Sequence, residues 1–148
     1  MFRGVTTVSL DSKGRLVVPA RYRDALVTLA EGRVVVTADA SQCLLLYPEP
    51  EWGPVEKRLM ELPAFNSRIR QLQRLMVGHA EVLDLDANGR ILLTPSLRQF
   101  AALEKSVVLV GQGSKFELWN DARWNALVEE ALSFKDGEMP PELEGFTL

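Results

Sequence analysis

Cysteine, histidine and long apolar runs are scarce in this chain of 148 residues. Cys43, the one cysteine, cannot form an intrachain disulfide, and it lies in an apolar run where a thiol serves as a small hydrophobe. No run approaches the roughly 18 apolar residues that span a bilayer, and the sequence starts without the long apolar region of a signal peptide. These absences predict a cytoplasmic protein without a membrane partner, in which Cys43 is a core residue and not a reactive thiol.

The residues on which most catalytic sites depend are also few. His79, the one histidine, has no cysteine or carboxylate partners at the spacing of a zinc site. Asp84 and Asp86 alternate along a predicted strand, but nothing around them marks a general acid or base. Residues 111–114 resemble a phosphate-binding loop only superficially, because no Gly-Lys-Ser or Gly-Lys-Thr follows. We therefore predict a protein that is not an enzyme and that uses no metal, cofactor or small-molecule substrate.

Charge is unevenly distributed along the chain. The net charge of −3 argues weakly against a nucleic-acid partner, because phosphate-binding surfaces are usually basic. Residues 1–79, however, carry 11 Lys or Arg and 8 Asp or Glu, whereas residues 80–148 carry 6 and 12. A basic N-terminal half can face phosphates while the acidic half keeps the particle soluble, since phosphate binding depends on the local potential and not on the total charge. Charge alone leaves this interpretation and an ordinary solvated surface equally open.

A repeated segment organises the chain. Residues 10–19, Leu-Asp-Ser-Lys-Gly-Arg-Leu-Val-Val-Pro, recur 75 positions later as residues 85–94, Leu-Asp-Ala-Asn-Gly-Arg-Ile-Leu-Leu-Thr. Arg23 matches Arg98 at the same offset. The sequence therefore predicts two copies of one supersecondary unit.

Each copy is expected to hold two short strands around a turn, then a short helix, then a β-hairpin. In the first copy these elements are expected at residues 6–10, 15–18, 20–26, 33–38 and 43–47. In the second copy they are expected at residues 81–85, 90–93, 96–101, 106–110 and 115–119. Helices with one apolar face are expected at residues 50–62, 66–76 and 121–132, the last capped by Asn120. The acidic tail from Lys135 to Leu148 is expected to fray unless it covers a neighbouring subunit.

The turn inside the repeated segment carries the most specific chemistry. Asp11 can accept hydrogen bonds from backbone amides across the turn, and Gly14 supplies the positive φ that such a turn needs. A single turn of this kind, with Arg15 paired to Asp11, is more often structural than functional. The first copy nevertheless lies among Lys and Arg residues, whereas the second has acidic neighbours. The two copies are therefore expected to share a structure and to differ in the potential around them.

Four segments together resemble the bacterial MraZ family, which belongs to the AbrB-like swapped-hairpin superfamily. They are residues 1–4, 10–23, 43–48 and 85–90, and the resemblance runs over nearly the whole chain. Two copies of the motif at this spacing make a specific signal, whereas a lone Asp-x-x-Gly-Arg would be weak. One departure is Thr94, which stands where the first copy has proline.

The resemblance implies a fold and a function. The fold would be α+β, mainly β, with two AbrB-like repeats forming a pseudo-dimeric swapped-hairpin β-barrel with flanking helices. The expected divisions are a first repeat at 1–50, a helical connector at 51–78, a second repeat at 79–122, and a C-terminal helix and tail at 123–148. Similar proteins form ring-shaped homo-oligomers. They regulate transcription at the nucleoid by binding short direct repeats of double-stranded DNA upstream of the division and cell-wall gene cluster, which includes their own gene.

Carried onto this sequence, Asp11 and Gly14 would structure the turn and Arg15 would contact DNA. An arginine can bind O6 and N7 of guanine through two hydrogen bonds, which contribute about 1–3 kcal/mol of discrimination. Whether Arg15 meets a base or a phosphate stays open here. The other candidate DNA-binding residues would meet phosphates, which fix position and make affinity salt-dependent: Lys13, Arg3 and Arg21.

The second copy of the motif supplies Asp86, Gly89 and Arg90. These residues match the first copy and would structure the equivalent turn. Their acidic surroundings favour a structural ion pair or a subunit contact over DNA binding.

Two other functions compete with DNA readout. A ring-forming protein-interaction scaffold would use the same fold without specific DNA readout, and the negative total charge and the amphipathic helices favour it. An antitoxin-type DNA binder that also neutralises a toxin fits the superfamily but not the two-copy length. The helical stretches at residues 56–76 and 121–132 are candidates for contacts between subunits.

Overall fold

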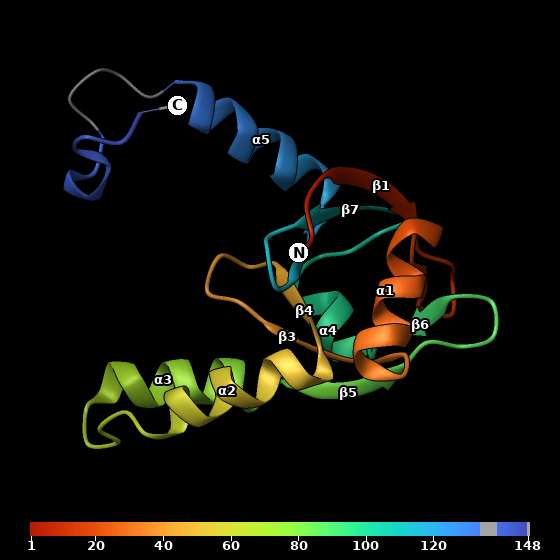
Figure 1. Cartoon of the computed structure of the whole chain (residues 1–148), viewed down its shortest axis with the longest axis horizontal. Helices are drawn as coiled ribbons and strands as arrows, with labels where there is room; N and C mark the ends of the chain where they lie inside the picture. The colour runs from red at the N-terminus through yellow and green to blue at the C-terminus, as the bar shows by residue number, and fades with distance from the viewer. Residues whose placement is uncertain (134–138, 148) are drawn as a thin grey trace.

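A six-stranded antiparallel sheet and a separate two-stranded ribbon form the centre of the molecule (Figure 1). The computed structural model describes residues 1–133 and 139–147. The first copy contributes β1 (Val5–Ser9), β2 (Arg15–Val17), α1 (Ala20–Ala30), β3 (Arg33–Ala38) and β4 (Leu44–Pro48), followed by α2 (Glu49–Met60) and α3 (Ser67–Met76). The second copy contributes β5 (Glu81–Asp84), β6 (Arg90–Leu92), α4 (Pro95–Phe100), β7 (Ser106–Gly111) and β8 (Phe116–Asn120), followed by α5 (Asp121–Leu132) and the 3-10 turn η1 (Pro141–Leu143). The predicted α+β class and the predicted order of elements are confirmed.

Strands of the two copies pair with one another. The sheet order is β1-β7-β8-β4-β3-β5, so β1 of the first copy lies beside β7 of the second, and β5 of the second lies beside β3 of the first. The ribbon consists of β2 from one copy and β6 from the other. Both the six-stranded sheet and the ribbon are therefore completed by strands from the two copies.

The predicted closure into a barrel is wrong for the residues that the structure describes. β1 and β5 are the two edges of the sheet, and the ribbon is a second, separate sheet. Only one isolated bridge, between Leu10 and Leu16, links the strand segments on either side of the first turn. The chain bends at the tight turn after β1. The backbone of β2 then pairs with β6 and not with a strand of the six-stranded sheet. This bend interrupts the ladder that a closed barrel requires.

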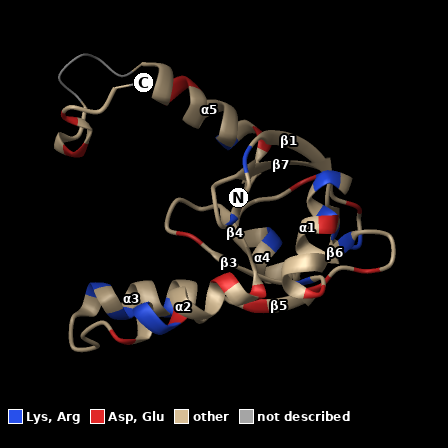
Figure 2. Ribbon diagram, viewed as in Figure 1, with Lys and Arg blue, Asp and Glu red and all other residues tan. Residues whose placement is uncertain are grey.

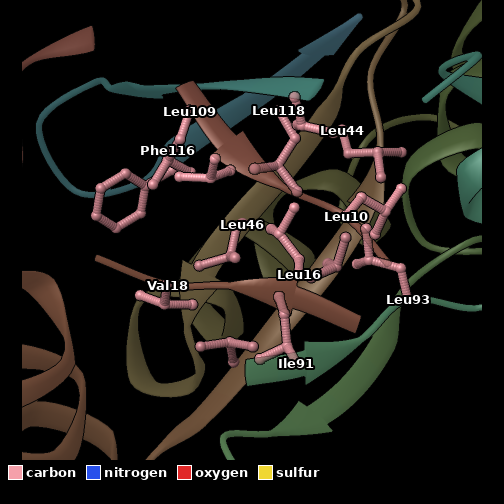
Figure 3. Packing of buried hydrophobic residues seen from close by; sticks show 14 of the residues in the cluster. Leu10, Leu16, Val18, Leu44, Leu46, Ile91, Leu93, Leu109, Phe116 and Leu118 are labelled. Atoms are coloured by element: carbon pink, nitrogen blue, oxygen red, sulfur yellow. The ribbon is translucent and has the colours of Figure 1, made fainter. Parts of the chain in front are cut away.

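The central strands bury both of their faces, with alternate residues pointing in opposite directions. Val34 and Val36 belong to the inner core cluster, whereas Val35 belongs to the outer one. Leu16 of β2 and Ile91 of β6 are 0% exposed. Both belong to the inner cluster, whose packing Figure 3 shows from close by. Helices α1 and α4 also pack on this inner face. Apolar contacts therefore join the ribbon to the sheet, together with the Leu10–Leu16 bridge.

The outer face of the sheet is covered by α2 and by the ends of α3 and α5. Trp52 of α2 packs on Tyr47 with a ring-centroid distance of 5.3 Å. Cys43 is buried in the same outer cluster, and burial raises the pKa of its thiol well above the ordinary value. The predicted core role of Cys43 is confirmed. Beyond these contacts, the α2–α3 hairpin and α5 extend away from the sheet on the same side of the molecule (Figure 1).

Helix α1 ends later than predicted, whereas α5 begins at its predicted cap. The first helix was expected to end at Leu26 but continues to Ala30, because both residues are buried against the core and the first left-handed residue is Glu31, at φ 55°. Asn120 caps α5 as predicted, with its side-chain oxygen accepting a hydrogen bond from the Arg123 amide at 3.1 Å. In the predicted tail from Lys135 to Leu148, residues 135–138 and 148 lie outside the described residues.

None of the helices in the described part of the chain is long and apolar enough to cross a membrane. In residues 1–133 and 139–147, no group of three or more histidine, cysteine, aspartate or glutamate side chains is placed to hold a metal ion.

Candidate nucleic-acid interface

The β2–β6 ribbon places one arginine from each copy on its outer face. Arg15 lies opposite Leu92, and Val17 lies opposite Arg90. Residues directly opposite in an antiparallel pair point to the same side, and the intervening Leu16 points into the core. Arg15 and Arg90 therefore point outward together, on a diagonal across the ribbon.

The first turn is held by Asp11. Its Oδ1 accepts hydrogen bonds from the amides of Lys13 at 3.0 Å and Arg15 at 2.9 Å, and its Oδ2 accepts one from Arg15 Nε at 2.6 Å. Gly14, at φ 90°, donates its amide to the Asp11 carbonyl at 3.0 Å. Because the ion pair occupies Nε, the two terminal nitrogens of the Arg15 guanidinium keep their donors for another ligand.

The second turn repeats this network almost bond for bond. Asp86 Oδ1 accepts from the amides of Asn88 at 2.8 Å and Arg90 at 2.9 Å, and Asp86 Oδ2 accepts from Arg90 Nε at 3.1 Å. Gly89, at φ 72°, donates to the Asp86 carbonyl at 3.0 Å. The two turns differ in charge at one position, where the first has Lys13 and the second has Asn88.

Both turn carboxylates are stabilised in their ionised form. The hydrogen bond from the Arg15 backbone amide is the main cause that holds the pKa of Asp11 below its ordinary value, and the guanidinium adds to it. The Arg90 amide lowers the pKa of Asp86 in the same way. Both carboxylates are therefore ionised at neutral pH, where each can hold the guanidinium that pairs with it.

Known proteins match this chain along its length. Residues 1–75 and 76–139 each match the family model described as "MraZ protein", a family also described as antitoxin-like. The chain belongs to the MraZ family. Similar proteins include the Transcriptional regulator MraZ of Thiobacillus denitrificans at 67% identity, of Nitrosospira multiformis at 60% and of Nitrosomonas europaea at 56%, each over 148 residues and covering 100% of both chains.

The remaining cations expected from the MraZ resemblance lie in a second group, at the N-terminal corner. Arg21 donates a hydrogen bond to the Thr6 hydroxyl, and its guanidinium lies 4.6 Å from the centroid of the Tyr22 ring. Tyr22 in turn donates its hydroxyl to the carbonyl of Arg3. Arg3 and Arg21 line the same shallow pocket, whereas Lys13 lines a groove beside β6. No hydrogen bond or ion pair within the described part of the chain joins the two groups.

Two further arginines, neither of them among the site residues expected from the sequence, lie against the turns. Arg98 of α4 covers Gly14, and Arg23 of α1 covers Gly89. The signal that could have found them is their recurrence at the offset of the MraZ motif itself. Both are half-buried, and neither has a carboxylate within 4.0 Å in the described part of the chain.

Proposed function

We propose that the chain is a sequence-specific, DNA-binding transcriptional regulator that acts at the nucleoid in the cytoplasm. Its sites would be short direct repeats upstream of the division and cell-wall gene cluster, including its own gene. The observation that carries this proposal is the outward placement of Arg15 on a two-stranded ribbon, with its guanidinium oriented by Asp11. The names of the relatives, which are transcriptional regulators, support it.

A two-stranded ribbon with outward arginines suits direct readout. The major groove of B-DNA admits a two-stranded β-ribbon, and an arginine that enters it can bind O6 and N7 of guanine. Asp11 leaves the two terminal nitrogens of Arg15 available in a fixed plane, which lowers the entropy lost when both hydrogen bonds form. We assign base contact to Arg15 for this reason.

Lys13, Arg3 and Arg21 are assigned to phosphates. Lys13 has an exposed side chain in the turn beside Arg15, and a lysine binds phosphate as a point charge. Arg3 and Arg21 lie together at the N-terminal corner, where Arg3 is exposed. Contacts of this kind position a protein on the duplex and carry no sequence information directly.

The pairing between copies supports a pseudo-dimeric swapped-hairpin arrangement. β1 pairs with β7 and β5 pairs with β3, so each copy places its first strand beside the hairpin of the other. We infer that one chain of this family combines two AbrB-like repeats in the way that two chains of a shorter relative would. The domain divisions predicted from the sequence remain part of this proposal.

The two projecting helical elements support assembly into a ring. Helix α3 has three exposed arginines and no acidic residue: Arg68, Arg70 and Arg74. Helix α5 has exposed acidic residues at Asp121, Glu129 and Glu130. Figure 2 shows positions of Lys and Arg in blue along the ribbon of α2 and α3. We propose that α3 of one subunit meets α5 of the next, a heterologous contact that generates a ring when the rotation closes.

Reversing the charge of α5 is expected to reduce the mass of the particle. In a variant with Glu129→Lys and Glu130→Lys, lysines would face the arginines of α3, and like charges at an interface disfavour association. Multi-angle light scattering should show a smaller species. Adding Arg70→Glu and Arg74→Glu should restore the native mass, because opposite charges face each other again. Glu31→Lys, at an exposed site after α1, is the matched control. Native mass in the α5 variant would contradict the proposed contact.

The proposed function is tested by an electrophoretic shift of DNA from upstream of the chain's own gene. We expect retardation of this DNA, and none of a scrambled duplex of equal length, at salt concentrations of about 50 mM and 200 mM. Retardation should weaken at the higher salt, because phosphate contacts release counterions. Equal retardation of both duplexes, or none of either, would reject specific readout and favour the ring-forming scaffold.

A further inference from the structure

The Gly14 peptide is held from outside by the second copy. The amide of Leu93 donates to the Gly14 carbonyl at 2.8 Å, and Arg98 Nε donates to the Leu93 carbonyl at 3.3 Å. The Arg98 side chain lies so close that a Cβ on Gly14 would be 2.7 Å from Nε and 2.8 Å from Cζ. A guanidinium therefore lies against the Cα of Gly14, where any residue other than glycine would displace it.

The Gly89 peptide is held in the same way by the first copy. The amide of Val18 donates to the Gly89 carbonyl at 3.0 Å, and Arg23 Nε donates to the Val18 carbonyl at 2.6 Å. A Cβ on Gly89 would lie 2.2 Å from Arg23 Nε. Glycine, clamping backbone and arginine are all related by the offset of 75 residues. The same device thus occurs twice, and each time the arginine comes from the other copy.

We propose that Arg98 is a positioning residue for the turn that carries Lys13 and Arg15, and that Arg23 positions the turn that carries Arg90. This inference rests on the proposed function in one respect only, that the Arg15 turn contacts DNA. Asp11 orders the turn from within, while Arg98 fixes the side of the turn that Asp11 does not touch. The second copy thereby contributes to readout by the first, even where its own Arg90 contacts no base.

An arginine suits this position better than a lysine. Its flat guanidinium can lie against a glycine backbone while Nε donates sideways, whereas a lysine ammonium has no donor at that point of the side chain. Arg98 also lines both open grooves beside the first turn, of about 960 and 370 Å³. Arg98→Lys keeps the charge and removes this hydrogen bond.

Amide hydrogen exchange tests the clamp without DNA. We expect Arg98→Lys to accelerate exchange about fivefold to tenfold in residues 12–16 and to leave residues 87–91 unchanged, since removing a hydrogen bond lowers local stability, here by about 1–1.4 kcal/mol. Arg23→Lys should do the reverse, which makes the two variants matched controls. Unchanged exchange in β4 would show that global unfolding is not responsible. If each variant instead accelerated exchange equally in both turns, the proposal would be overturned.

DNA binding tests the consequence for readout. In fluorescence anisotropy with the upstream duplex, Arg98→Lys should weaken specific binding about fivefold to tenfold. Arg98→Ala, which also removes the charge, should weaken binding and leave the salt dependence unchanged, because a positioning residue touches no phosphate. If Arg98 bound a phosphate directly, the salt slope of Arg98→Ala would instead fall by about 0.9 for each phosphate no longer neutralised, which would overturn the positioning role. Native affinity in a variant whose turn exchanges faster would also overturn the positioning role. If the unaltered protein binds no DNA, the proposed function fails, and the exchange experiment still tests the clamp.

Discussion

Arg15→Ala is expected to abolish selective retardation of the upstream DNA and to leave the mass of the particle unchanged. The substitution removes two candidate hydrogen bonds to guanine, which correspond to about 1–3 kcal/mol at each site. Several subunits bound to direct repeats would each lose this contact. Because linked sites bind with an effective concentration, the separate losses of affinity multiply. The turn itself should survive, since the Lys13 and Arg15 amides still donate to Asp11. Electrophoretic shift and light scattering on the same preparation measure both outcomes.

Arg90→Ala is the matched control for this experiment. Arg90 is paired to Asp86 in an equivalent turn and points to the same side of the ribbon, so removing it changes the structure to the same extent. Asn88 replaces Lys13 beside it, and the neighbouring strand carries Asp84. We therefore expect a smaller loss of affinity. Selective retardation by Arg15→Ala would contradict its assigned role, and a lower mass would show that Arg15 acts in assembly.

Phe116→Ala is expected to lower the free energy of unfolding by about 3–5 kcal/mol, the usual cost of removing a phenyl ring from a core. Phe116 of β8 is 1% exposed, and its ring centroid lies 4.3 Å from that of Phe2 and 4.8 Å from that of Tyr22. The three rings join the N-terminal arm, α1 and β8. The substitution should therefore also loosen the arm that carries Arg3.

Urea unfolding at fixed protein concentration measures this loss of stability, because an oligomer's apparent stability depends on concentration. Phe65→Ala serves as the control, since Phe65 is 89% exposed between α2 and α3. Its effect on subunit stability should stay within about 0.5 kcal/mol. A loss below about 1 kcal/mol for Phe116→Ala would show that the three rings do not stabilise the subunit as described.

Local patterns predicted the elements of this fold well. Short apolar runs separated by turn residues indicated strands at β3, β4, β7 and β8, and all four are present. Asn120 was expected to cap α5 and does so. Each of these features depends on residues within a few positions of one another, so a single sequence contains the information. The length of α1 was underestimated because burial of Ala30 against distant strands extends it.

The candidate site was only partly predictable. The ion pair of Asp11 with Arg15 follows from their spacing in a turn, and the structure contains it. The separation of Arg3 and Arg21 from that turn could not be inferred, because nearness in sequence does not specify nearness in space. Arg98 lies far from Gly14 in the chain, and its contact with that residue depends on how α4 packs on the inner core.

The sequence by itself determined that this chain has two copies of one unit, each with an Asp-x-x-Gly-Arg turn, because the repeat and the turn chemistry are local. Only the tertiary structure decided that the copies exchange strands, that Arg15 and Arg90 share one face of a ribbon, and that the sheet stays open. The physical reason is that pairings between strands far apart in the sequence are selected by burial of the whole core. Leu16 and Ile91 are hidden completely only when the two ribbon strands lie side by side over the sheet.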